Sequence, residues 1–182
     1  MALKPTIYKT KIQLTDNDRH IYTELNMTLA LHPSETPERM IARLLALCLE
    51  YEEGLEFSRG LSTPEEPAIW RHADNGTVQQ WIEMGHPEAS RLKKALGKSL
   101  GVSVYCYAKS TNIWWTQNCE TMARLDNINI FQFIWDDIKM LAGWLQRNLS
   151  LSVNVSGDQL YISDNQRVHT MQIIRLQHAN DH

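Results

Sequence analysis

Hydrophobic and polar residues alternate at both ends of the chain, which predicts antiparallel strands there. Near the N-terminus, residues 6–14 and 20–31 alternate around the polar turn Asp16-Asn17-Asp18, a pattern that favours a hairpin. A helix over residues 21–31 is the alternative. Three alternating segments close the chain and predict an antiparallel meander: residues 149–155, 159–163 and 167–176.

The middle of the chain alternates between strand and helix patterns, which predicts α/β layers. Thr36 is a suitable N-cap, Pro37 suits the first helical position and Glu38 complements the helix dipole. We expect this first, buried helix to continue to Gly54. Further helices are predicted over residues 87–99, 110–122 and 136–145. Unbroken apolar runs predict strands covered on both faces over residues 102–108 and 128–135.

Between the first two helices, two apolar runs flank the turn tripeptide Asp74-Asn75-Gly76, which predicts a β-hairpin. Glu66 precedes its first strand and Glu83 lies near the end of its second, so pairing brings both to one edge of the sheet. Two such carboxylates can hold a hard cation such as Mg²⁺, with the Met84 carbonyl as a third ligand. The alternative is that Glu83 simply faces solvent.

The helix after the hairpin carries Arg91, Lys94 and Lys98, whose spacing places them on one face. Such a face either contacts phosphates or is merely solvated. The six tryptophans have a simpler interpretation. Trp70 and Trp81 are expected to pack across the hairpin. The remaining four are expected to fill the core: Trp114, Trp115, Trp135 and Trp144.

Composition favours an ordinary globular protein, and 182 residues fit a single domain over residues 1–182. The formal charge of -3 argues against a generic nucleic-acid binder, although a local basic patch is compatible with it. Cys48, Cys106 and Cys119 are scattered, which supports neither a zinc site nor a disulfide framework.

Reduced thiols, the lack of a signal-peptide pattern and the lack of a membrane-length apolar run predict a cytoplasmic protein without membrane contact. Glycine-rich phosphate loops and nucleophile motifs are absent from the sequence, so no organic cofactor is expected.

Several segments together resemble the YaeQ family of small bacterial proteins, over essentially the whole chain: MALKPTIYKTKI, HPSETPERM, FSRGL, EEPAIW, WIEMGHPEASRLKKA, VYCYA and IWW. The resemblance implies an α/β fold with a mixed sheet, flanking helices and a PD-(D/E)XK restriction-endonuclease-like core. That core is described as a helix, a three-stranded antiparallel section, a second helix and a further strand. The terminal antiparallel strands are additions to it.

The same resemblance implies a nuclease-like site with departures from its pattern. Ala68 stands where the pattern has a metal-binding aspartate, which leaves Glu66 as the substitute. Gly85 replaces the lysine, so Lys94 or Arg91 would supply the positive charge. Glu38 resembles an acidic residue often found on the first helix.

Two functions follow as hypotheses. The first is a divergent Mg²⁺-dependent nuclease, with Glu66, Glu83, Met84 and Glu38 toward the metal and Lys94 or Arg91 as the cationic helper. The second is a non-catalytic protein of the same fold that binds nucleic acid or another protein through this surface.

Overall fold

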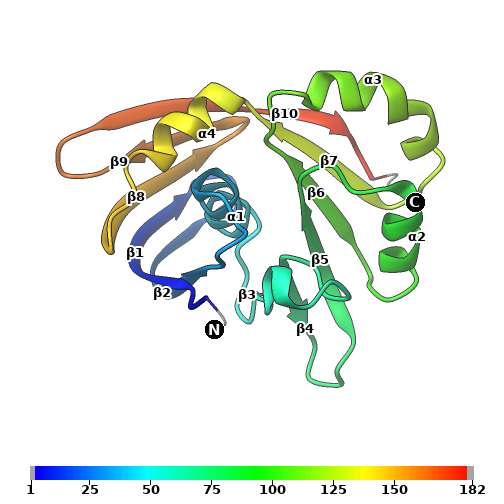
Figure 1. Cartoon of the computed structure of the whole chain (residues 1–182), viewed down its shortest axis with the longest axis horizontal. Helices are drawn as coiled ribbons and strands as arrows, with labels where there is room; N and C mark the ends of the chain where they lie inside the picture. The colour runs from blue at the N-terminus through cyan, green and yellow to red at the C-terminus, as the bar shows by residue number, and fades with distance from the viewer. Residues whose placement is uncertain (1–2, 180–182) are drawn as a thin grey trace.

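The computed structural model describes residues 3–179 and contains one ten-stranded mixed sheet in the order β2-β1-β8-β9-β10-β7-β6-β5-β4-β3. The sheet bends into two halves, and α1 (Pro37–Leu49) lies between them (Figure 1). The long strand β10 (Val168–Gln177) crosses from one half to the other along the top of the view. This continuous sheet holds the two predicted terminal strand groups against the central α/β part.

The first half of the sheet is built from both ends of the chain. β1 (Thr6–Asp16) pairs antiparallel with β2 (Ile21–Leu31), as the alternation predicts. β8 (Asn148–Ser156) lies parallel to β1 and antiparallel to β9 (Gln159–Ser163). β10 pairs first with β9 and then, from Ile173 onward, with β7. The C-terminal meander is therefore confirmed, and its last strand joins the halves.

The second half contains the predicted hairpin and the two buried strands. β3 (Glu56–Phe57), β4 (Ile69–His72) and β5 (Val78–Met84) are antiparallel. β6 (Val102–Cys106) and β7 (Ile128–Phe133) continue the sheet in parallel. α1, β3–β5, α2 and β6 follow the order that the family resemblance implies; kinship with nucleases stays a prediction.

Side chains of β5–β7 contribute to two separate apolar clusters, which explains their unbroken apolar runs. Ile82, Tyr105 and Phe133 face the cluster around α1. Trp81, Val104 and Ile130 belong to the other cluster, together with α2 (Ala89–Leu96) and α3 (Thr111–Met122). The remaining helical segments are η1 (Gly60–Ser62) and α4 (Trp135–Ala142).

The first helix begins as predicted but ends early. Thr36 caps it by accepting a hydrogen bond from the Arg39 backbone N–H at 3.2 Å. Residues 40–48 are all buried, because α1 is enclosed by the sheet and α4. The helix ends at Leu49 rather than near Gly54, since Glu50 leaves helical geometry and its carboxylate accepts from the Tyr105 hydroxyl at 2.8 Å.

The hairpin turn is confirmed, with Gly76 at φ 85°, a conformation that favours glycine. Trp70 and Trp81 are paired in register, and their rings meet edge-on with centroids 6.3 Å apart. Trp144 is buried, as expected. Trp114 and Trp115 of α3 pack against the cluster of Trp81 but are only partly buried, so the prediction that they fill the core is confirmed in part. The prediction for Trp135 was wrong, since it is a partly buried residue that starts α4.

Candidate functional site

Four of the six predicted site residues line one pocket of about 340 Å³, at the edge of the sheet where β5 ends: Glu66, Glu83, Met84 and Arg91. The loop before β4 supplies Glu66, β5 supplies Glu83 and Met84, and α2 supplies Arg91. Arg39 of α1 and His86 also line it. The hairpin thus brings its two acids to one edge, as the sequence predicts.

Glu83 is buried at 5% exposure, so the alternative of a solvent-facing carboxylate was wrong. Its Oε1 accepts hydrogen bonds from Trp81 Nε1 at 2.9 Å and from Arg91 Nε at 2.8 Å. Trp81 lies two residues earlier on the same strand, so its side chain points to the same face. A buried carboxylate needs such partners because desolvation without them is costly. Arg91 supplies the compensating charge.

Arg91 also ties the loop before β4 to the helix. Its Nη1 donates to the Pro64 carbonyl at 2.6 Å and its Nη2 to the Glu66 carbonyl at 3.0 Å. The guanidinium therefore bridges one carboxylate oxygen and two backbone carbonyl oxygens. This is the type of oxygen set that a hard cation takes in proteins.

Glu66 has its own arginine. Its Oε1 accepts from Arg59 Nη2 at 2.6 Å and Nε at 3.1 Å, while Oε2 accepts from the Arg59 backbone N–H at 3.1 Å. These hydrogen bonds, with the guanidinium charge, lower the pKa of Glu66. Each of the two acids at this edge is thus held by a separate arginine.

The two departures from the nuclease pattern have clear local surroundings. Ala68 is buried at 3% exposure, and its N–H donates to the Ile82 carbonyl across the hairpin at 3.1 Å. Gly85 has φ 90°, a conformation in which a lysine would be strained. Its N–H donates to the Tyr105 carbonyl at 2.9 Å. The strand end is therefore built around glycine.

In this arrangement the oxygen atoms of the pocket do not fit a cation well. Glu83 Oε1 already accepts from two N–H groups, Glu66 uses both oxygens for Arg59, and Ala68 offers no side-chain oxygen. Over residues 3–179, no three histidine, cysteine or acidic side chains group as a metal site would require. A cation at Glu83 would have to compete with Arg91.

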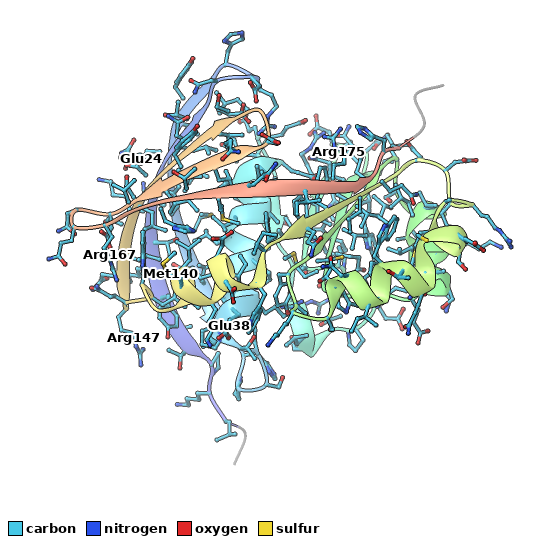
Figure 2. All side chains as sticks on the ribbon, turned by 90° about the horizontal axis from the view of Figure 1, so that it is seen from above. Glu24, Glu38, Met140, Arg147, Arg167 and Arg175 are labelled. Atoms are coloured by element: carbon cyan, nitrogen blue, oxygen red, sulfur yellow. The ribbon has the colours of Figure 1, made fainter. Side chains whose placement is uncertain are left out.

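The other two predicted residues lie outside this pocket. Lys94 is exposed on α2 and is not part of the pocket wall, so Arg91 is the cation that the fold brings to Glu83. Glu38 is partly buried in the first turn of α1 and is labelled near α4 in Figure 2. Its charge acts instead on the Tyr107 hydroxyl, whose pKa is raised mainly by burial.

His86 is a pocket residue that the sequence did not identify. Its ring stacks on Trp114 at 4.9 Å between centroids, and Nε2 lies 2.9 Å from Thr111 Oγ1. Burial lowers the pKa of His86. The sequence carries no spacing signal for this contact, because α3 reaches His86 only through the fold.

The chain matches the family model described as "YaeQ protein" over residues 1–173. It is 36% identical to "Uncharacterized protein YaeQ" of Salmonella typhi and 34% identical to that of Escherichia coli K12, each over 90% of this chain and 91% of the relative. The chain belongs to the YaeQ family.

Two crystal structures extend this relationship to the fold. The YaeQ protein of Xanthomonas axonopodis pv. citri has a TM-score of 0.92 at 32% identity, covering 97% of this chain and 99% of that one. The YaeQ protein of Pseudomonas syringae has a TM-score of 0.91 at 35% identity, covering 96% and 97%. The ten-stranded arrangement is thus similar to that of YaeQ proteins. In residues 3–179, no helix is long and apolar enough to span a membrane.

Proposed function

We propose that this member of the YaeQ family binds nucleic acid without cleaving it, through the pocket of Glu83 and the exposed face of α2. The observation that carries the proposal is the position of Arg91. Its guanidinium bridges the Glu83 carboxylate and the carbonyls of Pro64 and Glu66, so a built-in cation takes the place that a catalytic metal would need.

The basic residues next to Arg91 support a phosphate-binding role. Lys93 and Lys94 are exposed in the last turn of α2, and neither forms an ion pair with a described residue. Arg91 itself is 38% exposed on its side chain, so its outer edge is accessible to an anion. Unpaired surface lysines release counterions when they contact phosphates, which gives salt-dependent affinity. The overall charge of -3 limits this surface to modest affinity.

Binding is tested by fluorescence anisotropy with labelled single-stranded and duplex DNA and RNA at two salt concentrations. We expect binding that weakens with salt and that the double variant Lys93→Gln/Lys94→Gln reduces several-fold, about the loss of two phosphate contacts. The charge-matched control is Lys4→Gln/Lys139→Gln, which removes two exposed lysines outside α2. Equal loss in both double variants, or no binding to any of these ligands, contradicts the proposal.

The catalytic hypothesis is a second candidate, because Glu66, Glu83 and Met84 do line one pocket. In that reading Glu83 and Glu66 would hold Mg²⁺ and Arg91 or Lys94 would stand beside the phosphate. It requires Arg91 to release Glu83. Cleavage of the same nucleic acids in the presence of Mg²⁺ or Mn²⁺, lost in Glu83→Gln and retained in the Lys4→Gln/Lys139→Gln control, would favour this second function over the first.

A further inference from the structure

A second cavity, of about 510 Å³, lies at the opposite end of α1 from its Thr36 cap and shares no wall residue with the pocket of Glu83. It opens where the two halves of the sheet meet. The β1–β2 turn, the end of α1 and the β8–β9 turn contribute to its wall, together with β6, β7 and β10. A volume of this size is typical of small-molecule sites.

A carboxyl–phenol pair lies in the wall of this cavity. Tyr105 is buried at 2% exposure, and its hydroxyl donates to Glu50 Oε1 at 2.8 Å. Glu50 itself is only partly buried, so its carboxyl group is within reach of the cavity. Burial raises the pKa of Glu50, although hydrogen bonds from Ser103 and Tyr105 oppose this shift.

The remaining wall near this pair is apolar. Leu49, Phe131, Val155 and Ile173 line the cavity. Phe131 stacks on Tyr105 with ring centroids 4.8 Å apart, which fixes both rings. These side chains offer a surface for a hydrocarbon group adjacent to the Glu50 carboxyl.

The charged groups around the cavity are more acidic than basic. Asp16 is neutralised by Arg19, whose Nε lies 2.7 Å from its Oδ2. Within residues 3–179, the side chains of Asp18 and Asp158 accept only from neutral donors, the Gly157 N–H and the Gln172 amide.

Glu50 is a further acid without an ion-pair partner among the described residues. The only other charged wall residue is Arg175, on the part of β10 beside β7 (Figure 2); its guanidinium lies 5.0 Å above the Phe131 ring. The charge of Glu52 also acts on Glu50, and Glu52 itself forms an ion pair with Arg71. The cavity thus has an excess of negative charge once Glu50 is ionised.

We propose that this cavity binds a small organic amine, with the ammonium group at the Glu50 carboxylate and the hydrocarbon chain against Leu49, Phe131 and Ile173. In a diamine, the second ammonium group then lies beside the carboxylates of Asp18 and Asp158. The Tyr105 hydroxyl continues to donate to Glu50 Oε1, and the ammonium binds the carboxylate beside it.

The chemistry of position 50 is consistent with this role. A glutamine there would keep an oxygen acceptor for Tyr105 without the cost of placing a carboxylate next to apolar walls. A carboxyl group whose burial disfavours ionisation is useful where a cationic ligand arrives to pair with it. Of the groups facing Glu50, Tyr105 and Ser103 donate hydrogen bonds to it, and Arg19 is engaged by Asp16 and the Tyr51 carbonyl. An added cation therefore meets an acid that forms no ion pair with a described residue.

The test is NMR and calorimetric titration of the full chain with pentylamine and 1,5-diaminopentane, and with hexanoate and 1-pentanol as anionic and neutral probes of similar length. We expect both amines to bind, with the diamine tighter, and neither hexanoate nor pentanol to match them. Glu50→Gln should weaken amine binding by at least about tenfold, as expected for loss of a partly buried charge partner. Glu53→Gln, which removes an exposed acid three residues away, should leave the affinity unchanged.

Amide chemical shifts of Tyr105 and Ile173 should respond to the amines, which locates the binding in this cavity rather than on the surface. Three results would overturn the proposal. The first is no amine binding at about 10 mM ligand, a concentration that would largely saturate a site of millimolar affinity. The second is equal binding in Glu50→Gln with its fold intact by NMR. The third is preferential binding of hexanoate, which would assign the cavity to anions through Arg175.

Discussion

Arg91 Nε lies 2.8 Å from the Oε1 atom of Glu83, and this contact joins α2 to the end of β5 in the middle of the candidate site. The acid is 7% exposed on its side chain and the arginine 38%, so the pair is buried on one side and accessible on the other. An ion pair in this position both stabilises the hairpin edge and occupies the carboxylate. Structure and any chemistry at the pocket are therefore linked through one contact.

We predict that Arg91→Ala lowers the free energy of unfolding by about 2 kcal/mol, because the buried Glu83 carboxylate loses its cationic partner and keeps only the Trp81 N–H. The Pro64 and Glu66 carbonyls lose their arginine donors as well. Urea denaturation followed by circular dichroism measures this change. In the double variant Arg91→Ala/Glu83→Gln the loss should be smaller than the sum of the losses in Arg91→Ala and Glu83→Gln, since no buried charge remains. Additive losses would show that the two side chains are not coupled.

The Arg91→Ala variant also tests whether Arg91 and a metal ion compete for Glu83. If Arg91 occupies the place of a cation, Arg91→Ala should gain Mg²⁺ or Mn²⁺ affinity relative to the unchanged chain, because Glu83 loses its resident positive charge. Calorimetric titration of both proteins measures the gain. Glu83→Gln combined with Arg91→Ala is the control and should lose it. Equal, negligible metal binding in all variants would show that the oxygen set is unsuitable for a cation even when free.

Much of the fold follows from local patterns in the sequence. Alternation identifies β1, β2 and the C-terminal strands, and the Thr36-Pro37 start of α1 is a local signal that the structure keeps. The turn tripeptide Asp74-Asn75-Gly76 is a local signal of the same kind and specifies the hairpin. Such signals lie within a few residues of one another, so a single sequence carries them.

The site is less predictable because its contacts are long-range. Glu66 and Glu83 share a pocket as the hairpin predicts, but the choice of Arg91 over Lys94 depends on how α2 packs on β6. The end of α1 depends on Tyr105, 55 residues beyond Glu50. No sequence pattern predicts the cavity around Glu50, since its residues come from six separate elements.

Ala68→Asp places a carboxylate where the nuclease pattern has its aspartate. Ala68 is 3% exposed, so the unpaired charge should lower the free energy of unfolding by about 3 kcal/mol without metal. If the edge has a nuclease-like geometry, the midpoint of thermal unfolding should rise again with Mg²⁺, as binding to the folded state stabilises it. Thermal melts with and without Mg²⁺ measure both effects. Ala68→Asn is the matched control and should show little recovery.

The cap of α1 has a separate, simple expectation. Thr36→Ala removes the hydroxyl that accepts from the Arg39 N–H and should lower the free energy of unfolding by about 1 kcal/mol. Thr36→Ser keeps the acceptor oxygen and should be nearly neutral. Denaturant titrations of the two variants distinguish capping from other effects of the position. Similar losses in both would indicate that the threonine methyl group, rather than the hydroxyl, stabilises this end of the helix.

Glu50 should make stability depend on pH in a direction opposite to most surface acids. Burial raises the pKa of Glu50 above its ordinary value of 4.5, so between these two values the folded protein binds more protons than the unfolded chain. Stability therefore falls as pH rises through this window. Glu50→Gln cannot ionise and keeps an acceptor for Tyr105, so it should be more stable than the unchanged chain at neutral pH.

This advantage should shrink below about pH 4.5, where Glu50 is protonated in both states. Urea denaturation at several pH values, with Glu53→Gln as the control for removing an exposed acid, measures the difference. A Glu50→Gln protein that is less stable at neutral pH, with the deficit growing as pH rises, would mean that the ionised carboxylate is stabilised by Arg19 and Tyr105 more than burial penalises it. In that case the negative charge at position 50 would be a structural requirement of the folded protein.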